Sequence, residues 1–400
     1  MSGRVAAFLA IPVLIGLGLG LWLISKPSPT PRLALVPAAF GDLRGWTDDN
    51  QAAAAAALRR SCARWQRLPA NRPLGRTGIA GTVGDWRPIC AEALALPPDA
   101  AAPARAFFET HFRPYAVAMG GKTEGLFTGY YEAALRGSPR PDGEFKTPLL
   151  AKPDDLVMVD LGRFRDDLAG ERIAGRVVDG RLLPYATRAD IDAGALAGRD
   201  LELIWVDDPV DAFFLQIQGS GRVALPDGSD LRVGYAGHNG HPYFAIGREL
   251  IRRGALTRET VSMQSIRQWL ADNPDQAAEV MQLNASFIFF RPLDTDGPLG
   301  AQGVVLTPGR SLAVDRRHVP LGLPIWLDAS APSADGSEDR PLRRLMVAQD
   351  TGGAIRGPVR GDVYWGGDAA AAEIAGRMKH PGRWYLLLPR SLPPPGVAAH

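Results

Sequence analysis

The C-terminal part of the chain, from Phe289 onward, contains five short apolar segments that glycine or proline bounds. Segments of this length and composition are typical of β-strands. One helix interrupts them over residues 369–378, with Asp368 as its N-cap. Several short strands and a single helix favour a small β-barrel over a doubly wound sheet. The five segments are GVVLTP (303–308), PLGLPIWLD (320–328), RRLMVAQD (343–350), GDVYWGG (361–367) and GRWYLLLP (382–389).

The rest of the chain combines helices with strands. The aromatic, glycine-punctuated segment 125–133 predicts a strand that another part of the molecule approaches closely. Asp227-Gly228 predicts the turn of a β-hairpin between two arms of alternating apolar residues. Apolar spacing and capping residues predict helices. These lie over residues 48–68, 103–112, 243–254 and 259–272, and a further one begins at Pro274.

The segment FFLQIQ, residues 213–218, alternates in a way that predicts a strand. Phe213, Leu215 and Ile217 would face the core. Gln216 and Gln218 would lie on the opposite face beside the ring of Phe214. We expect that second face to offer amides to a ligand.

Composition and charge narrow the class of protein. Apolar residues make up 46% and charged residues 22%, which is typical of globular chains. The formal net charge of +2 provides no field that favours a nucleic-acid partner. The histidines are scattered, and the chain has no zinc-binding motif, no phosphate-binding loop and no G-x-S-x-G motif. The glycine-rich run GLGLG lies in the apolar N-terminal segment. We therefore expect neither a metal nor a cofactor.

An uncharged apolar segment runs from Val5 to Ile24, about the length that spans a bilayer. A cleavable signal is the alternative, but its apolar core is usually shorter and a small-x-small cleavage site follows it. SKPSPTP follows here instead, which favours an uncleaved anchor with a stiff spacer up to Pro31.

Cys62 and Cys90 are the two cysteines of the chain. In an exported domain they would form one disulfide, and in the cytosol they would be buried free thiols. The apolar N-terminal segment favours the disulfide.

Carboxylates, amides and aromatic rings remain as candidates for chemistry. Cleavage of a glycosidic bond needs a carboxylic acid that keeps its proton near neutral pH, and apolar surroundings raise the pKa accordingly. Asp362 precedes Val363, Tyr364 and Trp365, and the ring of Tyr364 or Trp365 could pack on a sugar face. The opposing interpretation is that an aspartate beside a glycine forms a turn.

Two further aspartates have equally ordinary interpretations. Asp350 lies in QDTGG, where its side chain would cap a turn. Asp315 precedes RRHVP, where it would be a surface ion-pair partner.

Several motifs in order resemble the membrane-bound lytic murein transglycosylase A (MltA) family over roughly residues 126–388. They include TGYYEA, FFLQIQGSGR, YAGHNGHPYFAIGREL, AVDRRHVPLG, LMVAQDTGGAIRGPVRGD and GRWYLLLP. The last third resembles that family's three-aspartate (3D) domain. The resemblance implies a mainly β protein, with a double-psi β-barrel from both ends of the chain and an inserted β-rich, substrate-binding domain. The implied ranges are 1–31 for anchor and spacer, 32–133 plus 289–395 for the barrel, and 134–288 for the insertion.

The resemblance also implies a reaction. Such an enzyme cleaves the β-1,4 bond between N-acetylmuramic acid and N-acetylglucosamine in peptidoglycan and leaves a 1,6-anhydro end. Asp362 would act first as acid and then as base. Asp350 would tune it, and Asp315 would support the site. We also expect Trp365 to bind substrate, because its flat ring could pack on a sugar. The residues that the resemblance implies as substrate-binding are Thr128, Tyr130, Gln216, Gln218, Ser220 and Gly221.

The chain departs from the family pattern at its N-terminus, because its first cysteine, Cys62, lies far beyond the apolar segment and cannot carry an N-terminal lipid. We therefore expect a periplasmic enzyme anchored in the inner membrane by residues 5–24. Its expected partners are peptidoglycan strands, the membrane, and proteins of cell-wall synthesis or division.

Two alternatives remain. A glycoside hydrolase could use Asp350 to activate water while Asp362 acts as the acid. A wall-binding module could also have lost turnover.

Overall fold

The structure is a computed structural model that describes residues 33–168 and 171–395. Six strands close into a barrel, in the order β17-β14-β15-β13-β16-β3, and β3 pairs again with β17. β17 closes the ring because it is long enough to pair with β3 through one end and with β14 further along. The strands are β3 (Gly125–Tyr130), β13 (Ser311–Val314), β14 (Pro324–Ala331), β15 (Arg340–Asp350), β16 (Arg360–Tyr364) and β17 (Lys379–Pro389).

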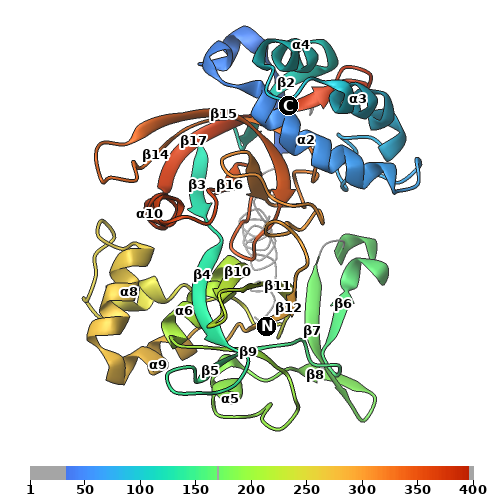
Figure 1. The fold of residues 1–400 in the computed structure, drawn as a ribbon. Helices are drawn as coiled ribbons and strands as arrows, with labels where there is room; N and C mark the ends of the chain where they lie inside the picture. The colour runs from blue at the N-terminus through green and yellow to red at the C-terminus, as the bar shows by residue number, and fades with distance from the viewer. Residues whose placement is uncertain (1–32, 169–170, 396–400) are drawn as a thin grey trace, which may run out of the picture.

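A helical layer covers one end of the barrel, at the top of Figure 1. It consists of α2 (Gln51–Gln66), α3 (Val83–Ala95) and α4 (Ala101–His111), with β1 (Leu33–Pro37) and β2 (Phe112–Met119) extending the sheet beside β17. One hydrophobic core joins this layer to the barrel and includes the fully buried Trp86, Trp326 and Trp384.

Buried polar contacts fix the helical layer on the barrel. Gln349 of β15 is fully buried and donates to the carbonyl of Ala57 and the hydroxyl of Ser61 on α2. Arg310 donates to both carboxylate oxygens of Asp49 at 2.8 Å. In both contacts a buried polar side chain meets a partner from the other layer, which offsets the cost of removing it from water.

The predicted disulfide is confirmed. Cys62 of α2 and Cys90 of α3 are bonded, with their Cα atoms 5.3 Å apart. The bond joins two helices of the layer that covers the barrel.

A second domain is inserted between β3 and β13 and lies at the other end of the barrel (Figure 1). Its main sheet has the order β12-β11-β10-β4-β9-β5, and a three-stranded sheet, β6-β7-β8, stands beside it. The main strands are β4 (Ala133–Ser138), β5 (Thr147–Leu150), β9 (Glu202–Val206), β10 (Ser220–Ala224), β11 (Asp230–His238) and β12 (Ile288–Pro292); the smaller sheet has β6 (Val157–Asp160), β7 (Arg172–Val178) and β8 (Arg181–Pro184).

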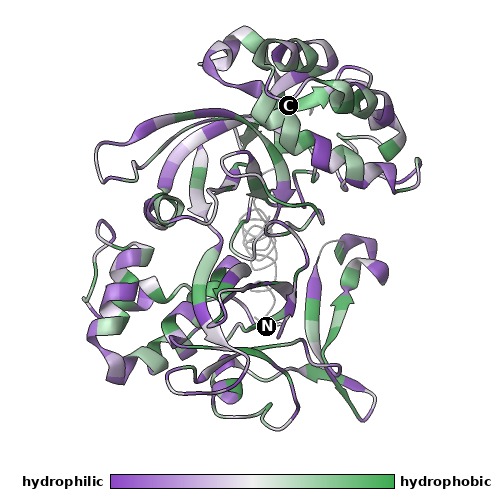
Figure 2. Ribbon diagram, viewed as in Figure 1, coloured by the Kyte–Doolittle hydropathy of each residue, from purple (hydrophilic) through white to green (hydrophobic). Residues whose placement is uncertain are grey.

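Helices flank the inserted sheet. In Figure 2 the outer helices α8 and α9 mix hydrophilic and hydrophobic residues, because each has a side that packs inward. One helix of the barrel domain also packs on the inserted sheet, since Ala371 and Ala375 of α10 belong to its core. The helices are α5 (Arg188–Asp192), α6 (Pro209–Gln218), α7 (Ile246–Arg252), α8 (Met263–Asp272), α9 (Pro274–Gln282) and α10 (Ala369–Arg377).

The structure confirms the prediction of a mainly β protein that has a barrel built from both ends of the chain and an inserted β-rich domain. The helices expected over five segments form close to their expected bounds, and Asp227-Gly228 lies between the paired strands β10 and β11.

The predicted strand FFLQIQ is wrong, because these residues end helix α6. Asp208 caps the helix by accepting from the amide of Val210, and Pro209 occupies the first helical position. Gly219 ends it with φ of 81°. On a helix Gln216 and Gln218 point in different directions, so the predicted face of paired amides does not exist.

The predicted strand GVVLTP is also wrong, because residues 303–308 form an irregular segment with one isolated bridge, between Val305 and Leu299. Arg60 of α2 donates to the carbonyls of Val305 and Leu306, which a strand would have directed to a neighbouring strand. The apolar side chains of Val304 and Leu306 are buried. The segment therefore has the apolar composition of a strand but lacks the backbone hydrogen bonds of a sheet.

Candidate active site

A row of residues crosses four barrel strands and carries the predicted catalytic groups. Ala313 of β13 is the register partner of Asp350 on one side and of Asp362 on the other. Asp362 is in turn the partner of Thr128 on β3. Register partners point to the same face of a sheet, and two strands span about 10 Å. The barrel thus brings together two aspartates that lie apart in the sequence.

Asp362 is held through one of its oxygens. The hydroxyl of Thr128 donates to its Oδ1 at 2.6 Å, and Nη2 of Arg360 donates to that hydroxyl at 2.9 Å. Within residues 33–168 and 171–395, no group donates to Oδ2 of Asp362. The residue is partly exposed, so this second oxygen can meet a ligand.

The surroundings of Asp362 favour its protonated form. Burial raises the pKa of its carboxyl, and the Thr128 hydrogen bond and the charge of Arg360 oppose the shift without cancelling it. A carboxyl group with a raised pKa and one free oxygen can deliver a proton.

Asp350 lies in the same row but has no free oxygen. Its Oδ1 accepts from the amides of Ala301 and Thr351 at 2.8 Å, and its Oδ2 accepts from the hydroxyl of Tyr130 at 2.8 Å. Burial raises the pKa of Asp350 to about 6 against these hydrogen bonds, and the charge of Asp362 adds to the increase. The two carboxyls are therefore coupled, and the pair retains a proton to a higher pH than isolated aspartates would.

Asp315 is fully buried but strongly acidic. Burial alone would raise its pKa, but Arg317 donates to both carboxylate oxygens and the amide of Gly357 donates to Oδ2. These contacts lower the pKa of Asp315 to about 2. Asp315 thus ties the loop after β15 to the end of β13 as an ionised group, and it is not placed to donate a proton.

The predicted substrate-binding residues divide into two groups. Thr128 and Tyr130 contact the two aspartates directly. Gln216 is buried away from them, where its carbonyl accepts from Arg188 at 2.6 Å.

Ser220 and Gly221 open β10 and pair with β11, and Gly221 also pairs with β4. An added Cβ at Gly221 would lie 2.4 Å from Leu215, so tight packing accounts for this glycine. Trp365 is partly buried, and its indole nitrogen lies 2.7 Å from the position of a Cβ at Gly129. Segment 125–133 was expected to be closely approached, and this contact confirms it.

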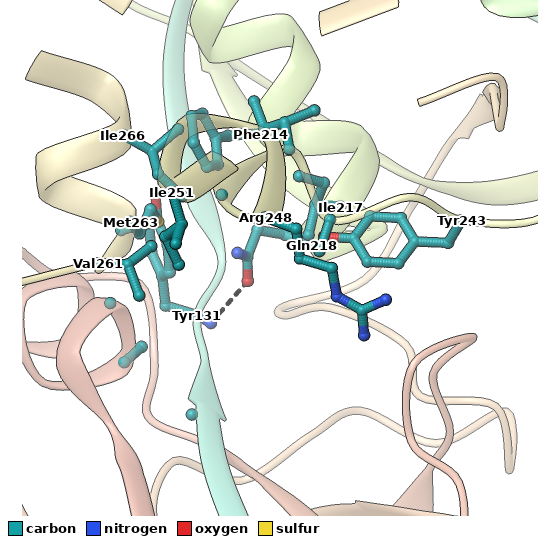
Figure 3. Close-up of a pocket in the computed structure, with 16 residues that line it drawn as sticks. Tyr131, Phe214, Ile217, Gln218, Tyr243, Arg248, Ile251, Val261, Met263 and Ile266 are labelled. Carbon is teal, nitrogen blue, oxygen red and sulfur yellow. Dashed lines mark hydrogen bonds between the residues drawn. The ribbon is translucent and has the colours of Figure 1, made fainter. Parts of the chain in front are cut away.

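A cavity of about 340 Å³ lies between the end of β3 and the helices of the inserted domain (Figure 3). It begins at Gly129, next to Thr128, and extends between α6, α7 and α8 of the inserted domain. Its walls are mostly apolar, and Gln218 lines it while accepting from the amide of Tyr131 at 3.1 Å. No described residue accepts from the amide nitrogen of Gln218, so this group is available to a ligand. The aspartates themselves do not line this cavity.

Arg360 was missed by sequence reasoning. It lies two residues before Asp362 in the same strand, and strand alternation would have placed both side chains on one face. Its contact with Thr128 depends on the pairing of β16 with β3, which no local pattern encodes.

In the part of the chain that the structure describes, no group of three or more histidine, cysteine, aspartate or glutamate side chains is arranged to hold a metal ion. Among the same residues, no helix combines the length and apolar character of a membrane span. The predicted anchor, residues 5–24, and its spacer lie outside the described residues.

Comparison with known proteins matches both parts of the molecule. Residues 126–291 match the MltA specific insert domain, and residues 310–388 match the 3D domain. The membrane-bound lytic murein transglycosylase A of Vibrio cholerae is 34% identical over 278 residues, which cover 68% of each chain. That of Escherichia coli K12 is 34% identical over 264 residues, or 65% of each chain.

Solved structures agree with these matches. A membrane-bound lytic murein transglycosylase from Agrobacterium tumefaciens superimposes with a TM-score of 0.78 at 36% identity, over 89% of this chain and 98% of that one. MltA from Neisseria gonorrhoeae superimposes with a TM-score of 0.73 at 35% identity, over 92% of this chain and 97% of that one. Escherichia coli MltA with bound chitohexaose superimposes with a TM-score of 0.62 at 26% identity, over 90% of this chain and 93% of that one.

By its fold, this is a six-stranded barrel protein with an inserted sheet domain of the MltA type. The chain belongs to the membrane-bound lytic murein transglycosylase A family.

Proposed function

We propose that this protein is a lytic transglycosylase that cleaves the β-1,4 bond between N-acetylmuramic acid and N-acetylglucosamine in peptidoglycan. The observation that carries the proposal is Asp362, a carboxyl group with a raised pKa and one oxygen free of protein donors. The names of the relatives support murein as the substrate, and the chitohexaose bound to Escherichia coli MltA supports a site for a sugar chain.

Asp362 acts twice in the proposed mechanism. Its free oxygen first donates a proton to the bridging oxygen, and the bond from that oxygen to C1 of the muramoyl unit breaks. The carboxylate then takes the proton of the C6 hydroxyl, and the C6 oxygen bonds to C1. The ring closes as a 1,6-anhydro sugar, no water is consumed, and Asp362 regains its proton.

Thr128, Asp350 and Asp315 have supporting roles in this proposal. Thr128 keeps Oδ1 of Asp362 occupied, which directs Oδ2 to the substrate. A charge on Asp350 opposes ionisation of its neighbour, which favours the acid form. Asp315 holds the loop around Gly357 beside the site.

The substrate would lie along the barrel row and reach the cavity at Gly129. Gln218 lines that cavity and would donate to a sugar hydroxyl, and Tyr130 supports Asp350. Gln216, Ser220 and Gly221 would shape this side of the inserted domain without touching the sugar. Trp365 would support β3 rather than stack on a ring, since Gly129 and Ala375 lie against it.

We further propose that the barrel has the double-psi topology, which the two parallel pairs, β13 with β15 and β16 with β3, support. The proposed division is residues 32–133 plus 289–395 for the barrel and 134–288 for the insertion. The proposed location is the periplasm, with residues 5–24 as an inner-membrane anchor. The membrane-bound relatives support the attachment.

A hydrolase would need Asp350 to activate water. Both of its oxygens already accept protein hydrogen bonds, so it offers little to a water molecule. The site therefore favours an intramolecular nucleophile over water.

The mass of the products tests the proposal. Digests of purified glycan strands should contain anhydro ends, which are one water lighter than hydrolysed ends. Asp362→Asn should lose at least about a hundredfold in turnover, the usual contribution of a general acid, and should still bind strands. Reducing ends alone would instead identify a hydrolase, and a wild-type protein that binds without cleaving would be a wall-binding module.

A further inference from the structure

Three arginines from distant segments gather where the barrel meets the inserted domain. Arg317, in the loop after β13, lies 3.7 Å from Glu171, which directly precedes β7. Gly75 packs against the same loop, since a Cβ there would lie 2.6 Å from Pro320. In each of these contacts, at least one contacting residue is followed or preceded in the sequence by a further arginine. These arginines are Arg316 in the loop, Arg172 at the start of β7 and Arg76 beside Gly75.

The three side chains carry charge that no described residue pairs. Among the described residues, none of them lies within 4 Å of a carboxylate or donates a side-chain hydrogen bond. Arg316 is half-buried, and Arg76 and Arg172 are exposed. Burial lowers the pKa of Arg316, the positive charges of Arg172 and Arg76 lower it further, and the charges of Asp160 and Asp315 oppose the shift without cancelling it.

Two carboxylates of this region, Asp315 and Glu171, are engaged with Arg317. Asp315 binds Arg317 and the amide of Gly357, and Glu171 pairs with Arg317. Asp160 is the register partner of Arg172 and makes no ion pair within 4 Å among the described residues, so its charge offsets one of the three arginines. Three arginines against the charge of Asp160 leave the cluster with a net positive charge.

The cluster lies close to the proposed reaction centre. Arg316 follows Ala313 by three residues, and Ala313 stands between Asp350 and Asp362 in the barrel row. Three residues of extended chain span about 10 Å at most. An extended arginine side chain and a substituent of a sugar bound over Asp362 can together span a distance of this size.

We propose that Arg316, Arg172 and Arg76 bind a carboxylate carried by the muramoyl unit of the substrate. The inference rests on the proposed function. N-acetylglucosamine is neutral, whereas muramic acid bears a lactyl group whose carboxylate is either free or extended by a peptide with carboxylates of its own. Guanidinium groups match carboxylates in geometry and charge. The cluster would let the enzyme distinguish murein from a neutral sugar chain of the same linkage.

Binding to the inactive Asp362→Asn protein tests the cluster apart from catalysis. The ligands are chitohexaose, glycan oligomers stripped of peptide, which bear free lactyl carboxylates, and oligomers with intact peptides. Arg316→Gln and the exposed Arg76→Gln should each weaken binding of a carboxylate-bearing ligand about tenfold, with a smaller salt dependence, and leave chitohexaose binding unchanged. Arg87→Gln, an exposed arginine on α3, is the matched control and should change neither.

The ligands also separate the two sources of carboxylate. A loss confined to stripped oligomers assigns the lactyl carboxylate, a loss confined to peptide-bearing oligomers assigns the peptide, and a loss with both assigns both. Equal losses with chitohexaose, or no loss with either charged ligand, would overturn the proposal. Failure of the proposed function would look different, because the wild-type protein would then release no anhydro product while charge-dependent binding persisted.

Discussion

Asp350 and Asp315 have the same side chain, yet their surroundings move their pKa values in opposite directions. Asp350 lies among neutral donors and close to Asp362, so burial prevails and its pKa is about 6. Asp315 is buried as well, but Arg317 and two backbone amides outweigh burial and lower its pKa to about 2. A positive partner within hydrogen-bond reach decides which of two buried carboxyls remains ionised.

This contrast predicts stability changes of opposite sign. The folded-state pKa of Asp350 exceeds the ordinary 3.8, so its ionisation destabilises the fold as pH rises through about 6. Asp350→Asn can retain the two amide contacts and donate to Tyr130. It should therefore gain stability relative to wild type between pH 4 and pH 7, by up to about 3 kcal/mol.

Asp315→Asn should change stability in the opposite direction. The depressed pKa of Asp315 stabilises the fold above pH 3.8 and ceases to do so as pH falls through about 2. The variant should lose about 2 kcal/mol at pH 7 and less at pH 3. Urea unfolding at several pH values measures both differences, and parallel pH trends for the two variants would contradict this account.

Thr128 predicts a shift in the pH profile. Its hydrogen bond lowers the pKa of Asp362. Thr128→Val should raise that pKa further, so activity should persist to higher pH before the acid form is lost. Thr128→Ser keeps the hydroxyl and should keep the wild-type profile. The measurement is kcat/KM against pH on purified strands, and an alkaline limb that moved to lower pH would refute the assigned role.

At the scale of elements, β3 joins the barrel site to the inserted domain. It pairs with β16 beside Asp362, closes the barrel against β17, and leads into β4 (Figure 1). Gly129 lets Trp365 and α10 approach this strand closely, because a Cβ there would lie 2.7 Å from the indole and 2.9 Å from Cα of Ala375.

Gly129→Ala should therefore destabilise the protein by about 1–3 kcal/mol, the usual effect of overpacking, and should reduce turnover because Thr128 is adjacent. Gly353→Ala is the matched control, since nothing lies within 4 Å of a Cβ at Gly353. Thermal unfolding and turnover on strands measure both variants. If Gly129→Ala matched the control, the packing of α10 on β3 would not matter to the site.

At the scale of the whole molecule, the helical layer and the barrel share one core, and the disulfide lies within the layer. It closes a loop with a sequence separation of 28 residues. Replacing Cys62 and Cys90 with serine should cost about 3 kcal/mol, chiefly by freeing the unfolded chain. Chemical unfolding with and without reductant should show the loss for the wild-type protein, and the double variant should not respond to reductant.

The sequence by itself determined the elements whose signals are local. Asn50 and Asp368 cap their helices, Asp227-Gly228 lies at a hairpin turn, and short apolar segments form most of the barrel strands. The motifs of the resemblance also contain Asp350 and Asp362. These features depend on residues close together in the chain, so neighbouring side chains suffice to encode them.

Only the tertiary structure decided the rest. FFLQIQ satisfies the alternation of a strand, yet Asp208, Pro209 and Gly219 outside that segment make it the end of a helix. The Arg360–Thr128–Asp362 chain of hydrogen bonds needs β16 to pair with β3, although more than two hundred residues separate the strands. Burial and long-range pairing set the acidity of each carboxyl, because both depend on which distant segments the fold brings into contact.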